Sequence, residues 1–382
     1  MRGGKDGTAR RGPIRPRGRI ALLCTPQNHQ NHVRSFPSVV NIPLMTNDER
    51  HEVGICYKEQ GQEAAIKLGN ALVTGAAKAE RLERWSAFCR SNPTEGYLYC
   101  HRGGLRSNIV RDWIQEETGV RYPLVAGGYK AMRQFLLDEL DRSMDPKNTE
   151  VVMLCGKTGS GKTRVIERMD KCSIDLEGLA NHRGSAFGSF PGDEQPSQID
   201  FENSLSVALL KLLDADARKA PKPVLVEDES NRIGRVGLPG VLKERMDTAD
   251  GGIVLIEETL EARVDVLVED YVVDLGRRFA RRHGDEDGPG MHRQFLLDAL
   301  KRIKNRLGGD RYEQVRRTME AACDEERIKG NTSLHRVWLA ALLEQYYDKM
   351  YDYQLSSHDR KVIFRGSRDA VTEWATATYQ AN

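Results

Sequence analysis

One glycine-rich segment constrains the fold of this 382-residue chain more than any other: Gly156-Lys157-Thr158-Gly159-Ser160-Gly161-Lys162-Thr163. It lies between an apolar run, Glu150 to Cys155, which predicts a buried strand, and Arg164-Val165-Ile166, which predicts the start of a helix. In this context glycines let backbone N–H groups wrap a diphosphate, while the lysine adds charge and the threonine reaches a metal bound to the phosphates. A chance glycine turn is the alternative. We therefore expect a diphosphate-binding α/β domain whose binding residues are Gly156, Thr158, Gly159, Ser160, Gly161, Lys162 and Thr163.

A second loop has a different chemistry: Cys100-His101-Arg102-Gly103-Gly104-Leu105-Arg106-Ser107. It follows a predicted strand, Tyr97 to Tyr99, and leads into a predicted helix from Arg106. Backbone N–H groups that curl toward the sulfur, the positive end of the helix, and the charges of Arg102 and Arg106 all favour a thiolate. A buried cysteine that happens to precede a turn is the alternative. The strand–cysteine–loop–helix order favours Cys100 as a catalytic residue, assisted by Arg102 and Arg106.

Composition excludes several classes of protein. With 39% hydrophobic and 30% charged residues the chain has enough apolar material for a core, and its length allows two domains. The net charge of +2 does not by itself indicate a nucleic-acid partner. No apolar run approaches the roughly 20 residues that span a membrane. The seven cysteines are scattered and lack CxxC spacing, which argues against a disulfide scaffold and a zinc site, so we expect no metal site of that kind and a reducing, cytoplasmic setting.

The pattern of strands and helices predicts four regions. Residues 1–35 are a poorly specified basic N-terminus, and residues 36–141 alternate strand and helix, which predicts a parallel sheet. The expected strands there are 39–44, 97–99 and 122–125, and the expected helices are 62–80 continuing to 89, 106–117 and 130–140. A polar linker follows at 142–148. Residues 149–260 form the diphosphate-binding α/β domain with further strands at 223–227 and 252–256, and residues 261–382 are mostly helical with one last strand at 362–364.

Two other segments could complete the diphosphate site. Glu227-Asp228-Glu229 follows a predicted strand, and Asp228 is the candidate acid that holds Mg²⁺ or orders water; a solvated acidic turn is the alternative. The stretch from Asp175 to Gly188 is dense in small and ionisable residues. Its His182 and Arg183 could face a phosphate or a base, unless the stretch is simply a polar surface loop.

The cysteine loop resembles the active loop of rhodanese domains, although the Asp-x-Arg element that normally ends their first strand is not found upstream of Val39. Taken together, the motifs between Val39 and Gly366 are similar to those of tRNA 2-selenouridine synthases, which fuse a rhodanese domain to a P-loop domain. The motifs that carry this resemblance are 41–50, 53–58, 100–107, 127–131, 156–163, 175–188, 227–230 and 344–348.

The resemblance implies a fold and an activity. The fold is a rhodanese-like parallel-sheet domain followed by a P-loop α/β domain and a mostly helical C-terminal region. The activity is conversion of a 5-substituted 2-thiouridine at the wobble position of tRNA to 2-selenouridine. It passes through S-geranylation by geranyl diphosphate and then replacement by selenium from selenophosphate, which a selenophosphate-supplying enzyme would provide. Cys100 is then essential for selenation, the P-loop binds the diphosphate, and Mg²⁺ is a candidate cofactor.

A tRNA surface should be basic and should offer stacking groups. Charge runs are often solvated faces, and tyrosines are often packed in a core, so this interpretation has an alternative. The helical region carries these candidate residues: Arg277, Arg278, Arg281, Arg282, Lys301, Arg302, Lys304, Tyr346, Tyr347, Tyr351 and Tyr353.

Two other functions stay open. One is a rhodanese-type sulfurtransferase fused to an ATPase or kinase-like domain. The other is a non-enzymatic nucleotide-binding module, which the presence of Cys100 disfavours.

Overall fold

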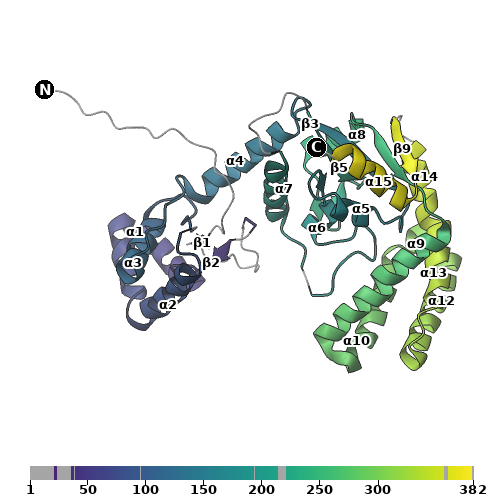
Figure 1. Cartoon of the computed structure of the whole chain (residues 1–382). Helices are drawn as coiled ribbons and strands as arrows, with labels where there is room; N and C mark the ends of the chain where they lie inside the picture. The colour runs from purple at the N-terminus through teal and green to yellow at the C-terminus, as the bar shows by residue number, and fades with distance from the viewer. Residues whose placement is uncertain are drawn as a thin grey trace. The chain divides into compact units, whose positions relative to one another are not determined.

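The computed structural model describes residues 21–23, 36–37, 39–94, 96–192, 194–213, 221–356 and 360–380. The chain divides into two compact units, residues 1–134 and 135–382, and the division falls inside helix α4 (Gly128–Ser143). Figure 1 shows the order of the elements along the chain. Except for β1 (Ala21–Leu23), the predicted N-terminal region 1–35 lies outside the described residues.

The first unit is mainly helical among its described residues. Helix α1 (Asn47–Leu72) changes direction at Gly61, and α2 (Gly75–Ser91) and α3 (Leu105–Thr118) follow. Thr46 starts α1 with a capping box, in which its hydroxyl accepts from the N–H of Glu49 and the Glu49 carboxylate accepts from the N–H of Thr46. The predicted continuous helix from residue 62 is wrong because the chain leaves the helical conformation between α1 and α2.

The predicted strands of this unit are shorter than expected. The segment 39–44 pairs only at β2 (Val40–Asn41), which lies parallel to β1. The segments 97–99 and 122–125 meet at one parallel bridge between Leu98 and Leu124. These pairings have the parallel sense that was predicted, but in the part of this unit that is described they do not confirm a rhodanese-type sheet.

Trp85 on α2 organises the core of the first unit. It is fully buried, and its Nε1 donates to the carbonyl oxygen of Ile42 at 3.1 Å. Arg81, one turn earlier, donates to the carbonyl oxygen of Leu44 at 2.8 Å and pairs with Glu49 at 2.7 Å. The chain that enters α1 is therefore fixed to α2 by buried polar contacts, which are favourable because each partner is satisfied.

The second unit contains the predicted parallel sheet. Its strand order is β4 (Ser173–Ile174), β5 (Lys222–Glu227), β3 (Thr149–Gly156), β8 (Ile253–Ile256) and β9 (Val362–Gly366), with every neighbouring pair parallel. The glycine-rich loop follows β3, the central strand (Figure 1). A short antiparallel pair, β6 (Arg232–Ile233) and β7 (Val236–Gly237), lies outside this sheet. The α/β class and the strands of this domain are confirmed.

Both faces of the sheet are covered by helices. Alternate strand residues such as Val151 and Met153 join one core with α7 (Gln198–Leu212) and α8 (Gly240–Thr248). Their neighbours Val152 and Leu154 join a second core with α5 (Lys162–Arg168) and α15 (Arg368–Tyr379). This period of two is what a strand buried on both sides requires. Leu140 and Met144 also enter the first of these cores, so the segment around the predicted linker packs with the second unit.

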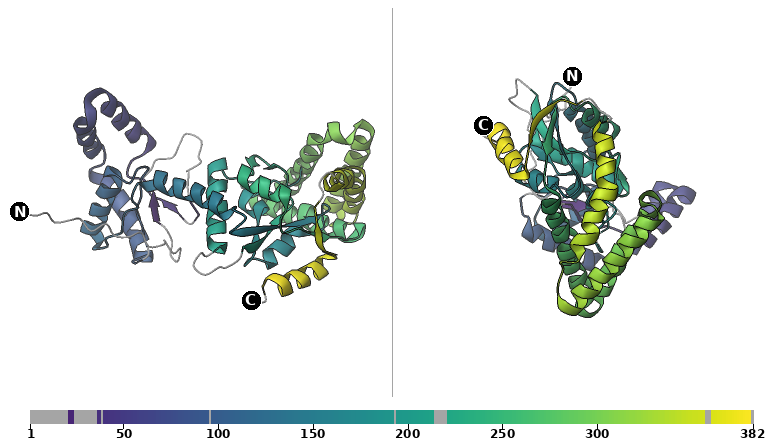
Figure 2. Two further views of the ribbon diagram at one scale, coloured as in Figure 1. Left: turned by 90° about the horizontal axis from the view of Figure 1, so that it is seen from above. Right: turned by 90° about the vertical axis from the view of Figure 1, so that its right-hand side faces the viewer.

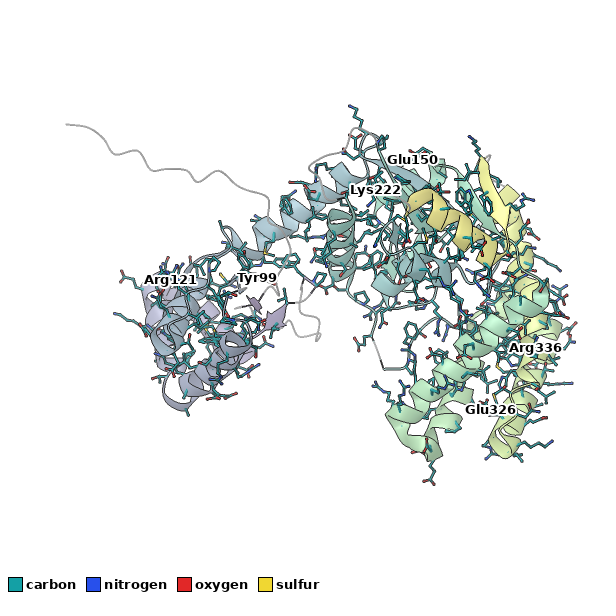
Figure 3. All side chains as sticks on the ribbon, viewed as in Figure 1. Tyr99, Arg121, Glu150, Lys222, Glu326 and Arg336 are labelled. Carbon is teal, nitrogen blue, oxygen red and sulfur yellow. The ribbon has the colours of Figure 1, made fainter. Side chains whose placement is uncertain are left out.

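The remaining residues form a helical region, as predicted. It consists of α9 (Leu260–Leu267), η1 (Val268–Asp274), α10 (Leu275–Arg302), α11 (Lys304–Leu307), α12 (Gly309–Lys329), α13 (His335–Leu342), η2 (Leu343–Tyr347) and α14 (Asp348–Ser356). The long helices α10 and α12, in shades of green in Figure 2, share a core with Trp338 on α13. Glu326 and Arg336, labelled in Figure 3, lie on α12 and α13. Among the residues described, no helix is both long and apolar enough to cross a bilayer.

Candidate phosphate-binding loop and thiol site

The glycine-rich loop joins β3 to α5. Gly159 and Gly161 adopt the left-handed backbone region with φ of 82° and 80°, where a side chain would be strained. A Cβ atom at Gly159 would also approach the carbonyl oxygen of Arg263 to 2.7 Å. Nζ of Lys162 donates to the carbonyl oxygen of Gly156 across the loop at 2.9 Å. The loop therefore combines two left-handed glycines with an ammonium group held across it, an arrangement suited to a diphosphate.

Residues of the helical region hold this loop in place. Nε of Arg263 donates to the carbonyl oxygen of Thr158 at 2.9 Å, and its Nη2 pairs with Asp348 at 2.5 Å. Nζ of Lys157 pairs with Asp352 at 2.9 Å. Because Arg263 is only 4% exposed, its charge-assisted contacts are shielded from water. The predicted binding residue Thr158 thus also serves, through its backbone, to fix the loop.

Two buried polar atoms at the loop have no hydrogen-bond partner among the described residues. They are Oγ of Ser160, within the loop, and Nη1 of Arg368. Arg368 is the first residue of α15, and a Cβ atom added to Gly161 would lie 2.9 Å from its Nη1. Buried polar groups are normally paired, and an anion in the loop is a suitable partner for both. Arg368 is a candidate ligand that sequence reasoning missed, because no local motif connects it with the loop.

Three glutamates form an acidic cluster next to the loop. Oγ1 of Thr163 donates to Oε2 of Glu177 at 2.9 Å, and the N–H of Glu177 donates to Oε2 of Glu227 at 3.3 Å. Burial, reinforced by the charge of Glu177, raises the pKa of Glu227 well above its ordinary value. Burial and the same charge raise the pKa of Glu229 to about 8. The cluster can therefore hold or accept protons near neutral pH.

The acid singled out from the sequence, Asp228, has an ion-pair partner outside this cluster. Its Oδ1 pairs with Nη1 of Arg360 at 3.6 Å. Its neighbours Glu227 and Glu229 interact with Glu177 instead, because alternate side chains of an extended segment point in opposite directions. The structure brings the outer members of the acidic triplet, and not its central one, to the threonine-bound carboxylate, and the role predicted for Asp228 stays a prediction.

The predicted residue His182 lies in a tight loop over the acidic cluster. A bridge between His182 and Ser189 closes the loop, and the N–H of Gly184 donates to the carboxylate of Glu177. Burial, together with the charge of Arg302, lowers the pKa of the His182 imidazole. Its Nδ1 is buried without a partner among the described residues. A neutral imidazole beside the loop can therefore receive a hydrogen bond from a ligand.

The other residue predicted from this segment, Arg183, is engaged by the helical region. Its Nη2 pairs with Asp274 at 2.8 Å, and its Nη1 donates to the carbonyl oxygen of Asp270 at 3.0 Å. The guanidinium also lies over the ring of Phe190 at 4.9 Å. These contacts give Arg183 a structural role that joins the 182–189 loop to η1.

The cysteine loop has the geometry of an anion nest. The N–H of Gly104 donates to Sγ of Cys100 at 3.3 Å, and Oγ of Ser107 lies 3.5 Å from the sulfur. Burial by itself would raise the pKa of the Cys100 thiol, but hydrogen bonds from Ser107, Gly104 and the N–H of Arg102 outweigh it, so the net shift is downward. Tyr99, labelled in Figure 3, is fully buried directly before the cysteine.

The Gly127-Gly128-Tyr129 segment packs directly on this loop. The N–H of Tyr129 donates to the carbonyl oxygen of Cys100 at 2.9 Å. Gly128 has φ of 59°, and a Cβ atom there would lie 2.0 Å from that same carbonyl oxygen. Only glycine permits this approach, which explains why the segment begins with two glycines. The remaining predicted residues, Arg102 and Arg106, line one cavity together with Cys100.

The helical region exposes only part of the predicted tRNA surface. Arg278 pairs with Asp274 at 3.0 Å, and Arg302 donates to the carbonyl oxygen of Ala186 at 2.6 Å. Tyr347 is 5% exposed and lies in the core, whereas Tyr353 is 76% exposed. A buried ring cannot stack on a base, so Tyr347 is excluded as a stacking group in this conformation and Tyr353 is retained.

Comparison with known proteins identifies the family. A family model described as the tRNA 2-selenouridine synthase AAA domain matches residues 149–382. The chain is 46% identical over 341 residues to the tRNA 2-selenouridine synthase of Marinobacter nauticus, covering 89% of this chain and 90% of that protein. This chain belongs to the tRNA 2-selenouridine synthase family. The family predicted from the sequence motifs is thereby confirmed, and the chain is an enzyme of that type.

Other members of the tRNA 2-selenouridine synthase family match equally fully. The protein of Alcanivorax borkumensis is 48% identical over 338 residues, covering 88% of this chain and 90% of its own length. That of Bordetella bronchiseptica is 44% identical over 340 residues, covering 89% of each. The N-terminal domain of an ATP/GTP binding protein from Clostridium difficile 630 matches 31% of this chain and 91% of its own, with 27% identity and a TM-score of 0.26. A score this low carries no fold assignment, so the P-loop arrangement rests on the strand order and loop geometry above.

Proposed function

We propose that this protein converts a 5-substituted 2-thiouridine at the tRNA wobble position to 2-selenouridine in two steps, S-geranylation and then selenation. The relatives are named for 2-selenouridine formation in tRNA. The observation that carries the two-step form is the presence, in one chain, of a diphosphate-type loop and a low-pKa thiol in an anion nest. Each step has a loop suited to its reactant.

In the first step the P-loop binds geranyl diphosphate. The sulfur of the thiouridine attacks the terminal carbon of the geranyl group, the carbon–oxygen bond breaks, and diphosphate leaves while the base loses its N3 proton. Lys162, the loop N–H groups and Arg368 offset the charge that grows on the leaving diphosphate. A glutamate of the acidic cluster is the candidate acceptor of this proton, and the pKa of Glu229, raised to about 8, makes its ionised carboxylate a stronger base than an ordinary glutamate.

The residues beside Thr163 fit a magnesium ion only in combination with the diphosphate. Hydroxyl and carboxylate oxygens, here from Thr163 and Glu177, are the hard ligands that Mg²⁺ prefers. In the described part of the chain no group of three or more His, Cys, Asp or Glu side chains is arranged to hold a metal by itself. Mg²⁺ commonly binds through one or two carboxylates together with substrate phosphates. When bound, such an ion would neutralise phosphate charge.

In the second step the geranylthio group is the leaving group. Selenium of selenophosphate attacks C2 of the base, the carbon–sulfur bond breaks, and geranylthiol leaves with a proton. Water then cleaves the phosphorus–selenium bond to give phosphate and 2-selenouridine, so no oxidant or reductant is needed. The nest around Cys100, with Arg102 and Arg106 beside it, is the site for the selenium anion. The free cysteines among the described residues suit a reducing, cytoplasmic setting and supply of selenophosphate by a partner enzyme.

The tRNA would contact the exposed basic residues of the helical region, such as Arg281, Lys301 and Lys304, with Tyr353 available for stacking.

Nucleoside mass spectrometry tests the whole proposal. Thiolated tRNA is incubated with the protein, geranyl diphosphate and selenophosphate. We expect the selenium mass, and a geranylated nucleoside when selenophosphate is left out. An unchanged tRNA would contradict the proposal and favour a sulfurtransferase fused to an ATPase-like domain.

A further inference from the structure

The first unit contains a cavity of about 910 Å³ that opens beside Cys100. This volume lies within the roughly 300–1,000 Å³ of pockets that enclose small organic ligands. Apolar side chains from α1, α3 and the preceding segment form much of its wall: Leu44, Val53, Ile66, Val73, Ile109 and Trp113. An anionic selenium donor would not need such a wall, because burying apolar surface stabilises only apolar ligand groups.

Cations lie on the same cavity. Arg50 and Lys58 on α1 line it, as do Arg102 and Arg106 of the cysteine loop. Nε of Arg50 is buried without a hydrogen-bond partner among the atoms that the structure describes. A buried N–H group normally has a partner, and a phosphate of a bound ligand is a suitable one for this nitrogen. The cavity thus combines an apolar wall, phosphate-binding cations and a low-pKa thiol.

We propose that this cavity binds the S-geranylated wobble nucleotide, with the ten-carbon tail against the apolar wall and the nucleotide phosphates on the cations. The inference rests on the proposed function and assigns a site to the substrate of its second step. In this arrangement the carbon–sulfur bond, which joins the apolar tail to the polar base, lies where the apolar wall meets the thiol nest. Selenium held in the nest is then close to C2, and the tail selects the geranylated base over the unmodified thiouridine.

A glycine on α1 allows the cavity to be filled without disturbing the fold. Gly54 lines the cavity, and a Cβ atom added there meets nothing within 4 Å. The Gly54→Phe variant should therefore place a ring in the space for the tail. Gly54→Ala controls for loss of the glycine. Gly290→Phe on α10 is the matched control, since that glycine is also exposed to open space and does not line the cavity.

The test compares two anticodon stem-loop RNAs that carry one S-alkylated 2-thiouridine, with either a geranyl or a methyl group. Binding and selenation with selenophosphate are measured for the wild-type protein and the three variants. We expect the wild type to bind and selenate the geranyl RNA at least about tenfold better than the methyl RNA. Several additional methylene groups buried in an apolar pocket give discrimination of at least this size. Gly54→Phe should remove most of this preference in both binding and kcat/KM, while Gly54→Ala and Gly290→Phe keep it.

Three results would overturn the inference and are distinguishable. Equal use of both RNAs by the wild type means that the tail is not recognised, although the proposed function stands. Loss of geranylation of a thiouridine RNA by Gly54→Phe, with unchanged selenation of the geranyl RNA, assigns the cavity to the first step. Failure of the wild type to selenate either RNA contradicts the proposed function itself, and the inference falls with it.

Discussion

The hydroxyl of Thr163 donates to Oε2 of Glu177 at 2.9 Å, which connects the phosphate-binding loop to the acidic cluster. Glu177 in turn accepts the N–H of Gly184 and donates its own N–H to Glu227. Glu177 therefore connects the end of the loop, the 182–189 segment and the last residue of β5. A change at Glu177 should affect the diphosphate step more than a change at Asp228, which pairs with Arg360.

The first prediction concerns this carboxylate. Glu177→Gln keeps the shape but removes the charge that accepts the Thr163 hydrogen bond and that would neighbour a magnesium ion, so we expect geranylation to fall by about tenfold or more. Asp228→Asn is the matched control, because Asp228 pairs with Arg360 away from the cluster. Rates of formation of the geranylated nucleoside are compared at saturating RNA. Equal losses in the two variants would contradict the assignment.

Lys162 separates the two steps. Lys162→Ala removes the ammonium held 2.9 Å from the carbonyl oxygen of Gly156, so geranylation should weaken by roughly a hundredfold, as loss of one well-placed charge on a leaving group does. Selenation of an RNA that already carries the S-geranyl group should be unchanged. Lys211→Ala, an exposed lysine on α7, serves as the control. If Lys162→Ala loses both activities, the loop is needed for both steps or for the stability of the folded protein, and its assignment to the first step alone is wrong.

Cys100→Ala should give the opposite result. Removing the sulfur leaves the P-loop untouched, so the geranylated nucleoside should form at nearly the wild-type rate while 2-selenouridine is lost. Cys323→Ala on α12 is the control for removal of a thiol. Full selenation by the Cys100 variant would refute its role. Circular dichroism of both variants confirms that the helices are retained.

The downward pKa shift of Cys100 predicts its reactivity. A lowered pKa increases the thiolate fraction at neutral pH, so iodoacetamide should alkylate Cys100 before Cys323, whose pKa burial raises to about 12. Ser107→Ala removes a hydrogen-bond partner of the sulfur and should move the pH midpoint of Cys100 alkylation upward. Peptide mass spectrometry at a series of pH values gives both midpoints. A midpoint unchanged in Ser107→Ala would show that the backbone N–H groups suffice.

Local pattern was enough to predict the second unit but not the first. The central residues of β3, β5 and β8 are buried on both faces of the sheet, and such runs are visible in a sequence because consecutive residues are apolar. Within the described ranges, the segments 97–99 and 122–125 pair with each other at the Leu98–Leu124 bridge alone, and the extent of pairing depends on partners that lie far along the chain. The break between α1 and α2 similarly lacks a strong local signal.

The candidate site was predictable where a motif is contiguous. The loops at 100–107 and 156–163 carry their own geometry, but Glu177 and Arg368 reach the second loop only through the folded sheet and α15. Whether Asp228 or its neighbours lie near Thr163 depends on which side of the extended segment faces that threonine. Side chains alternate along the segment, so a shift of one residue exchanges the two sides. The packing of Gly128 on Cys100 likewise requires the tertiary structure.

The last prediction concerns stability and pH. Because burial and the charge of Glu177 raise the pKa of Glu229 to about 8 from 4.5, the native state retains a proton there that the unfolded state has lost. The stability that this proton contributes is complete below the unfolded pKa and is lost as pH rises through about 8. Glu229→Gln cannot ionise, so its melting temperature should exceed that of the wild type by an amount that grows from pH 6 to about pH 8 and levels off above it. Glu244→Gln, an exposed residue on α8, should follow the wild type. If Glu229→Gln also follows the wild type across that range, the carboxylate is ionised in the native state throughout, and Glu229 lacks the raised pKa that would make it a strong proton acceptor beside the loop.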